Sequence, residues 1–377
     1  MNVLVPNLGS TSLKYQILEM PGERVLARGK LERVTDYREA IRQIPLDDTP
    51  IGVVVFKTVH AGADYRGTFR VDGVLLAALE RFLPAAPAHN RIYLAGIRAF
   101  QEALPDAVLV AAFETEFHAT MPEHVVRYGV PAEWRDGEQV RKYGFHGASH
   151  EYVSHRAPGI AGRKLRRLVS CHLGGSSSIC AIEDGRSVDT TMGFSPQSGL
   201  ENATRHGDLD VFAALYMMQR RGWSVEQVTG ELAKTGGLSG LSGIAGGDVR
   251  DIEAAAAAGN QNAELALEVF YYQIRKTIGA YSAVMSGLDG IAFTGGIGEN
   301  SARLRGRVCE GLSFLGVALD PLRNEDGAGD RLVSADTSAV PVVALSTNEE
   351  LIVARRAWRL IAGLSPTVLS EGPKNLL

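Results

Sequence analysis

The chain alternates between short apolar runs and longer amphipathic segments over most of its length. Apolar, β-branched runs at residues 3–5, 52–56, 107–113 and 290–293 predict buried strands. Amphipathic segments predict helices between them, and residues 260–286 form the longest of these. Strands that alternate with helices are typical of layered α/β domains, in which helices cover the faces of a sheet.

Two stretches share one design, which is an apolar strand, a turn rich in glycine and hydroxyl groups, and a second apolar strand. They are residues 3–19 (VLVPNLGSTSLKYQILE) and 168–183 (LVSCHLGGSSSICAIE). Such a turn can wrap backbone N–H and hydroxyl donors around an anion, and Lys14 adds a positive charge. Taken alone, either stretch fits an ordinary β-hairpin equally well. Because the design recurs, we expect two similar domains with phosphate-binding hairpins across a cleft, as in the actin, sugar kinase and Hsp70 superfamily.

Composition narrows the class of protein. A length of 377 residues favours two domains, and a net charge of −4 implies no polyanion-binding surface, so no nucleic acid partner is expected. No apolar run approaches the roughly 20 residues that cross a bilayer, and no secretion signal opens the chain, so no membrane partner is expected. Cys171, Cys180 and Cys309 are isolated in or beside apolar runs. This spacing predicts buried free thiols in a reducing cytoplasm.

Charged and polar side chains follow two of the buried strands. Lys57 and His60 come after the strand at 52–56, and Glu114, Glu116 and His118 come after the strand at 107–113. In α/β sheets, ligands bind beyond the carboxyl ends of the strands. Any one of these residues is more often solvated or structural, but together they predict a charged cleft.

Glycine-rich segments suggest further ligand contacts. Residues 294–300 (TGGIGEN) predict a glycine turn before a helix at 301–312, where glycines admit a ligand and the helix start offers N–H groups to phosphate. We also expect a ligand-facing loop at 236–247 and a loop at 84–90. Neither GxGxxG nor GxxxxGK[ST] occurs in the chain, so ATP binding would depend on the hairpins and the glycine turn.

These stretches together resemble one family, acetate kinase and its short-chain carboxylate kinase relatives. The matching motifs occur in the family's order and run almost end to end: NLGSTSLKYQ, APAHN, FETEFHATMP, RKYGFHGASH, CHLGGSSS, VDTTMGFSPQSGL, ATRHGDLD, FTGGIGENS and STNEEL. The resemblance implies an α/β fold of two similar ribonuclease H-like domains around a central cleft. It places an acid-binding domain at 1–117 plus 352–377 and a nucleotide-binding and dimerisation domain at 118–351.

The resemblance also implies an activity, which is reversible, ATP-dependent phosphorylation of a short-chain carboxylate such as acetate or propionate to an acyl phosphate. Transfer would be direct and in line, in a homodimer, with ATP as co-substrate and Mg²⁺ (or Mn²⁺) held near Asn7 and Glu349. Glu114, His146 and Arg205 match the family's catalytic positions, with His146 and Arg205 stabilising the transition state. For those two, the competing interpretation is a hydrogen bond that only braces a loop.

Two further sets of residues are implied by the same resemblance. The acid-binding positions are Lys57, Val59, Ala88, Arg91, Phe145 and Pro196. The nucleotide- and phosphate-binding positions are Ser10, Ser12, Lys14, His172, Leu173, Gly174, Gly175, Ser176, Asp248, Val249, Arg250, Gly296, Ile297, Gly298, Glu299 and Asn300.

The chain departs from the family's pattern mainly around the acid. Lys57 replaces an arginine and so lacks a planar fork, Glu114 replaces an aspartate, Ala88 a leucine and Arg91 a proline. Gly175-Ser176 stands where the family has asparagine-glycine. Three hypotheses follow: a kinase for acetate or a related acid, a kinase for a larger or hydroxylated acid with weak acetate activity, and a catalytically impaired nucleotide-binding regulator. The metal, nucleotide and transition-state positions persist, which favours an active kinase.

Overall fold

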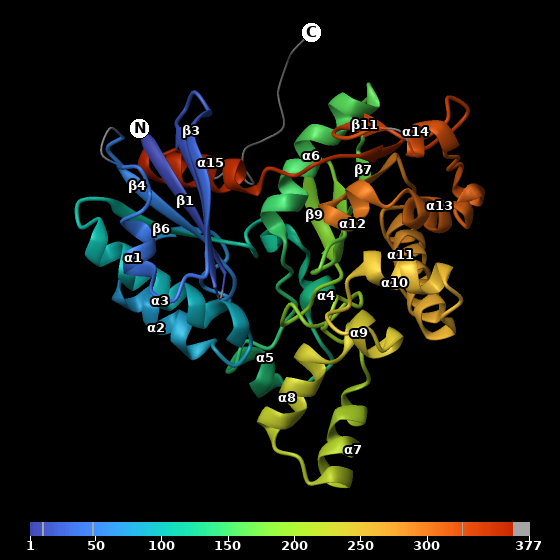
Figure 1. Ribbon diagram of the computed structural model, residues 1–377, viewed down its shortest axis with the longest axis horizontal. Helices are drawn as coiled ribbons and strands as arrows, with labels where there is room; N and C mark the ends of the chain where they lie inside the picture. The colour runs from blue at the N-terminus through green and yellow to red at the C-terminus, as the bar shows by residue number, and fades with distance from the viewer. Residues whose placement is uncertain (10, 47–48, 326, 365–377) are drawn as a thin grey trace.

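The computed structural model describes residues 1–9, 11–46, 49–325 and 327–364. The chain forms two lobes, each built on a six-stranded mixed sheet (Figure 1). The chain up to β6, blue to cyan, forms one lobe, and the green to orange segments form the other. The last helix, α15 (Glu349–Ile361), returns to the first lobe and packs on its sheet.

The two sheets have the same topology. The first contains β1 (Asn2–Gly9), β2 (Ser12–Glu19), β3 (Arg24–Glu32), β4 (Val53–Thr58), β5 (Thr68–Arg70) and β6 (Val108–Phe113), in the order β3-β2-β1-β4-β6-β5. The second contains β7 (Arg167–His172), β8 (Ser178–Glu183), β9 (Arg186–Thr190), β10 (Gly290–Thr294), β11 (Arg331–Leu332) and β12 (Val342–Ala344), in the order β9-β8-β7-β10-β12-β11. In each, two antiparallel hairpins lead into three parallel strands and an antiparallel edge strand. The repeat predicted from the two hairpins is therefore a repeat of the whole sheet.

Helices cover both faces of the first sheet, and side chains that alternate along each strand pack against them. Leu4, Val54 and Phe56 pack against α1 (Tyr37–Ile41), α2 (Gly73–Arg81) and α3 (Pro87–Ala103). Their neighbours Val3 and Val53 face the opposite way, toward α15. A strand that buries both faces reads as a continuous apolar run, which is why the sequence identified these strands.

The second sheet is covered in the same manner. Val169 and Cys171 pack against α10 (Val249–Ala257), α11 (Gln261–Val284) and α13 (Ala302–Glu310), while Leu168 faces α6 (Gly147–Ala161). The remaining short elements are η1 (Phe117–Thr120), α4 (Glu123–Val126), α5 (Ala132–Asp136), α7 (Val211–Arg221), α8 (Val225–Lys234), α9 (Gly237–Ser242), α12 (Gly295–Asn300), η2 (Ser313–Leu315) and α14 (Pro321–Glu325). None of the described helices is both long and apolar enough to cross a bilayer. All three cysteines are buried free thiols, as predicted.

Some boundaries differ from those predicted. The loop expected at 84–90 already contains the first turn of α3, which Pro87 opens at a position that needs no N–H donor. The glycine turn expected at 294–300 is the short helix α12, and α9 forms within the loop expected at 236–247. Glycine allows many backbone conformations, so its presence alone does not show whether a segment forms a turn or a helix. The C-terminal segment expected to lack structure lies mostly at 365–377, outside the described residues.

Candidate active site

An ion-paired lysine lies at the centre of the candidate site. Lys57 lies near the end of β4, Glu114 follows β6, and Glu349 opens α15. The Lys57 ammonium donates to the Glu349 carboxylate and lies 3.8 Å from an oxygen of Glu114. Burial opposes the positive charge, but the two carboxylates outweigh it and raise the pKa of Lys57. Lys57 is therefore a fixed cation held between two carboxylates.

Glu114 has spare acceptor capacity. Its side chain is buried, and neither carboxylate oxygen has a hydrogen-bond partner among the described residues. Burial raises the pKa of Glu114, an effect that the nearby Lys57 only partly offsets. Burying a carboxylate without hydrogen bonds costs folding free energy. The two Glu114 oxygens are therefore available to accept from a ligand or to coordinate one.

The backbone around His146 is bonded to the backbone of Glu114. His146 has φ of +91°, in the left-handed region that non-glycine residues rarely adopt. The next N–H, that of Gly147, donates to the Glu114 carbonyl oxygen at 2.9 Å, and a Cβ at Gly147 would lie 2.3 Å from that oxygen. Strained backbone of this kind gathers at functional sites. The turn holds His146 beside Glu114.

The His146 imidazole contacts the hairpin tip of the second sheet. Its Nδ1 lies 2.8 Å from Ser178 Oγ and its Nε2 lies 3.1 Å from Ser176 Oγ. The ring packs on His172, with centroids 4.5 Å apart, and His172 Nδ1 lies 4.0 Å from a Glu349 oxygen. Burial, reinforced by His172 and other positive neighbours, holds the pKa of His146 well below its usual value. His146 is therefore a neutral imidazole at physiological pH.

Arg205 is carried by a loop that is bonded to the same hairpin tip. The Ala203 N–H donates to the Gly175 carbonyl at 3.0 Å, and the Asn202 side-chain oxygen accepts from the Ser177 N–H at 2.6 Å. The Arg205 guanidinium donates to the Pro196 carbonyl at 2.8 Å. Burial, with smaller effects from the Arg205 guanidinium and the Lys57 ammonium, lowers the pKa of His89 to about 4, so cations from both lobes lie near one imidazole.

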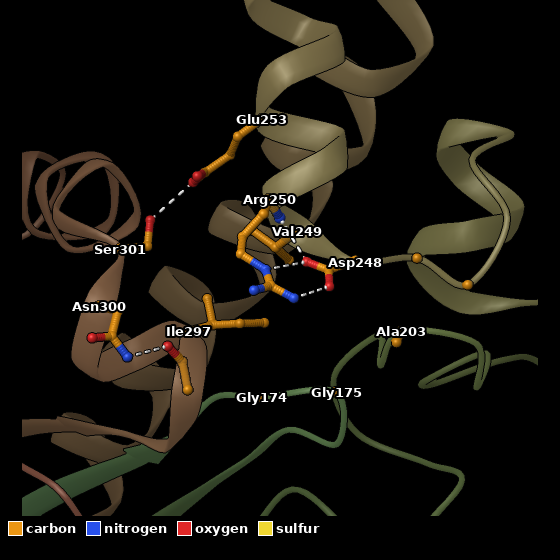
Figure 2. Close-up of a pocket in the computed structure, with 13 residues that line it drawn as sticks. Gly174, Gly175, Ala203, Asp248, Val249, Arg250, Glu253, Ile297, Asn300 and Ser301 are labelled. Carbon is orange, nitrogen blue, oxygen red and sulfur yellow. Dashed lines mark hydrogen bonds and ion pairs between the residues drawn. The ribbon is translucent and has the colours of Figure 1, made fainter.

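A pocket of about 730 Å³ opens beside the hairpin tip in the second lobe. Figure 2 shows the Gly174–Gly175 turn on one side, α12 with Ile297 and Asn300 on another, and Arg250 at the start of α10. Asp248 caps α10 by accepting from the Arg250 N–H and also binds its guanidinium. Walls of glycine and a few apolar side chains suit a flat ring, and the adjacent turn offers N–H groups to its phosphates.

Comparison with known proteins decides the family. The acetokinase family model matches residues 35–355. The chain belongs to the acetokinase family. It is 42% identical to the acetate kinase of Geobacillus kaustophilus, over 95% of this chain and 98% of that one. As a member of this family, the chain is a phosphotransferase with a carboxyl group as acceptor.

Solved structures agree with this assignment. The acetate kinase of Porphyromonas gingivalis superposes with a TM-score of 0.85 at 34% identity, over 96% of this chain and 99% of that one. The propionate kinase of Francisella tularensis superposes with a TM-score of 0.87 at 31% identity, over 94% and 98%. The likeness extends over both lobes, so the two-domain fold that the sequence predicted is confirmed.

The positions matched to the acetokinase acid site are brought together only in part. Val59 and Phe145 are both buried members of the apolar core that packs on one face of the first sheet, and Pro196 is buried where its carbonyl binds Arg205. Arg91 is exposed on α3 and forms no hydrogen bond or ion pair with another described residue. The side chain of Ala88 lies outside the described part of the chain.

The first hairpin presents its matched residues at one end. Asn7 on β1 pairs with Lys14 on β2, and Ser12 pairs with Gly9 beside the turn. Lys14 is exposed, and Ser10 lies outside the described residues. In the second lobe His172, Leu173 and Ser176 lie at the β7–β8 turn, while Gly298 and Glu299 belong to α12.

Three members of the charged cleft expected from the sequence are internal braces. His60 packs against Phe82 and contacts the Phe194 carbonyl. Glu116 accepts from Thr68 and pairs with Arg356, and His118 lies in the core. Of that group, only Lys57 and Glu114 face the candidate site.

The structure also assigns site residues that the sequence reasoning did not single out. Ser178 contacts His146, and Ser149 contacts His172 at 2.7 Å. Gly246 and Gly247, which end the loop expected to face a ligand at 236–247, do line the pocket. The run of three serines at 176–178 was the available signal, but it does not show which hydroxyls face inward.

Proposed function

We propose that this protein transfers the terminal phosphoryl group of ATP to acetate or propionate, forming the acyl phosphate. The observation that carries the proposal is the Lys57 ammonium near the end of β4, between two carboxylates and two residues before the buried Val59. An ammonium group next to an apolar side chain suits a short aliphatic carboxylate. Membership of the acetokinase family supports the same reaction.

We infer that catalysis depends on charge and positioning, with no covalent enzyme intermediate. Arg205 and the His146 Nε2 edge would donate to the equatorial oxygens of the transferred group, where charge develops. Lys57 would hold the acid, and Glu114 would orient Lys57. The pocket between Gly174, Arg250 and Ile297 would hold the nucleotide so that its phosphates point to the hairpin tip.

The residues present fit a magnesium ion bound with the nucleotide. Glu349 offers a carboxylate and Asn7 an amide oxygen, and Glu114 has two oxygens free of hydrogen bonds in the described structure. Mg²⁺ favours such hard oxygen donors, takes one or two carboxylates and completes its shell with phosphates and water. When bound, the ion would neutralise negative charge on the nucleotide phosphates. Glu349 would share its carboxylate between the ion and Lys57.

Trapping the acyl phosphate with hydroxylamine tests this function. We expect ATP-dependent hydroxamate from acetate and propionate, and none when EDTA removes divalent ions. Butyrate, glycolate and lactate belong in the same panel, since a clear preference for one of them would point to a larger or hydroxylated acid. ATP hydrolysis without hydroxamate from any acid would refute the proposal and indicate a nucleotide-binding regulator.

We also propose a homodimer located in the cytoplasm. Helix α7 projects from the second lobe (Figure 1) and has no buried residue, and it exposes Val211, Phe212 and Tyr216. An apolar patch of this kind seldom faces water, and twofold symmetry is the commonest way to cover it. Light scattering should give twice the chain mass, and Phe212→Glu should give the monomer. The buried free thiols suit a reducing compartment.

A further inference from the structure

A chain of hydroxyl and imidazole groups runs from the core of the second lobe to His146. Ser170 on β7 lies 2.8 Å from His150 Nδ1, and His150 Nε2 lies 2.9 Å from Ser178 Oγ. Ser178 Oγ in turn lies 2.8 Å from His146 Nδ1, and His146 Nε2 faces Ser176 Oγ. Ser170, His150 and Ser178 are all completely buried. The four hydrogen bonds form one continuous line that ends at the candidate site.

The direction of this line follows from its buried end. Ser170 Oγ has no hydrogen-bond partner in the described structure besides His150. If Ser170 accepted from His150, its own buried hydroxyl proton would have no acceptor, and an unpaired buried donor is unfavourable. If Ser170 donates, every donor in the line is paired: Ser170 to His150 Nδ1, His150 Nε2 to Ser178, and Ser178 to His146 Nδ1. His146 then carries its proton on Nε2.

The electrostatic surroundings agree with neutral rings. Burial lowers the pKa of His146 and of His150 well below the usual value, so each ring carries a single proton. A neighbouring histidine gives an independent example of the arrangement. His118 Nε2 contacts the Phe145 carbonyl, which can only accept, so its Nδ1 must accept from Ser187.

We propose that Ser170, His150 and Ser178 are positioning residues that hold His146 in the Nε2–H tautomer, so that it donates to the transferred phosphoryl group. This inference rests on the role proposed above for His146. The opposite tautomer would present a lone pair to the phosphoryl oxygens, which are themselves acceptors. We call the hydrogen-bonded line from Ser170 through His150 and Ser178 the relay. It moves no proton during the reaction and only determines which nitrogen of His146 carries the proton.

The tautomers can be read directly from two-bond ¹H–¹⁵N spectra of histidine-labelled wild-type enzyme, with His146 and His150 assigned from their Gln variants. We expect Nε2–H for both rings, and Nδ1–H at either ring would overturn the proposal. The tautomers are read in the wild-type enzyme, and the Gln variants serve only to assign the two rings. It is also separate from the proposed function, since a normal kcat for His146→Gln would refute the catalytic role and leave the tautomer result unaffected.

Ser178→Ala tests whether the relay matters to the reaction. It should move the His146 Nδ1 resonance to that of a nitrogen without a hydrogen bond and lower kcat by about tenfold or more, as loss of supporting contacts often does. KM for acid and nucleotide should change little. Ser178→Thr keeps the hydroxyl and should restore most of kcat. An unchanged kcat in folded Ser178→Ala, or equal losses in the Ala and Thr variants, would contradict a positioning role.

Ser187→Ala is the matched control. It removes the same kind of hydroxyl–imidazole bond from His118, but the Phe145 carbonyl still holds that ring as Nε2–H. We expect kcat within about twofold of wild type and an unchanged His146 spectrum. If Ser187→Ala lowered kcat as much as Ser178→Ala does, the loss of any buried serine hydroxyl would have the same effect. That result would contradict the positioning role proposed for Ser170, His150 and Ser178.

Discussion

At the scale of single residues, the two cations of the site differ in how far they are already neutralised. Lys57 is paired with Glu349 and lies near Glu114, so carboxylates already oppose its positive charge before any ligand binds. Arg205 makes one hydrogen bond to the described residues, with a neutral carbonyl at Pro196. Its remaining N–H donors and its full charge are therefore available to a phosphoryl group.

Arg205→Ala should therefore lower kcat much more than it raises KM. The loss of a donor aimed at developing charge costs about 3 kcal/mol of transition-state stabilisation, or roughly 100-fold in kcat. Arg205→Lys keeps the charge without the fork and should retain part of the rate. Steady-state kinetics with ATP and acetate measure both. A near-normal kcat for Arg205→Ala would show that the residue only braces the loop at Pro196.

At the scale of elements, the start of α6 sets the position of His146. The helix begins at Gly147, whose N–H binds the Glu114 carbonyl, and His146 precedes it in the left-handed region. The geometry depends on the absence of a Cβ at Gly147, because that atom would lie 2.3 Å from a backbone oxygen. This bond joins the two ends of the segment between β6 and α6.

Gly147→Ala should destabilise the protein by about 1–3 kcal/mol, the usual range for overpacking, and should also reduce kcat because His146 moves. Gly159→Ala is the control in the same helix, since it is exposed and its Cβ would meet nothing within 4 Å. That change should stabilise by roughly 0.5–1 kcal/mol through helix propensity. Chemical denaturation and kcat measure both variants. If the two variants changed stability and kcat to the same extent, the close approach of Gly147 to the Glu114 carbonyl oxygen would be ruled out.

The elements also show how far the sequence could be read. Strands such as β1, β4, β6 and β10 were predicted because burial on both faces makes their sequences continuously apolar. The edge strand β5 and the short helix α5 were not, because they bury little and carry no periodic signal. Helix α12 was taken for a turn, since its glycines oppose helix formation locally and its contacts with β7 override that preference.

The parts of the candidate site that lie within one sequence motif could be predicted. The contacts between segments that are distant in the sequence could not. The turn residues and the pairing of Lys57 with Glu114 follow from strand ends that share one edge of a sheet. The pairing of Lys57 with Glu349, 292 residues away, and the line from Ser170 to His146 depend on tertiary packing. No local pattern in the sequence specifies either.

At the scale of the whole molecule, buried histidines link stability to pH. Folding lowers the pKa of seven of the nine histidines, chiefly through burial, to about 4 for His60 and about 3 for His118. Between those values and the unfolded value near 6.5, the unfolded chain binds more protons than the folded one. Three buried glutamates with raised pKa, among them Glu114 and Glu116, act in the opposite sense but are fewer.

The free energy of unfolding should therefore be nearly constant from pH 8 to 7 and should fall steadily below about pH 6.5. Urea titrations at each pH in a constant-ionic-strength buffer measure this. The slope should correspond to an uptake of more than one proton on unfolding. A stability that stays level or rises between pH 6.5 and 5 would mean that the raised carboxyl pKa values dominate.

The placement of the site favours domain closure. We propose that the unit of residues 1–117 plus 352–377 rotates against the unit 118–351. Lys57 and Glu114 belong to the first unit, whereas the nucleotide pocket, His146 and Arg205 belong to the second. On α15, Arg356 donates to Glu151 on α6 and pairs with Glu116 at 3.4 Å. These buried contacts join the two units on the side of α15, and the Gly147–Glu114 and Lys57–Glu349 contacts join them at the site.

A nucleotide and an acid bound on different units react only when the units bring them into line, and closure also excludes water that would hydrolyse the acyl phosphate. The radius of gyration from solution scattering should therefore fall when a non-hydrolysable ATP analogue, Mg²⁺ and acetate are all present. The analogue alone should give a smaller change, and acetate alone almost none, because each contacts mainly one unit. Superimposable scattering curves for the free and fully liganded enzyme would mean that the two units are already closed and that the acid enters by another route.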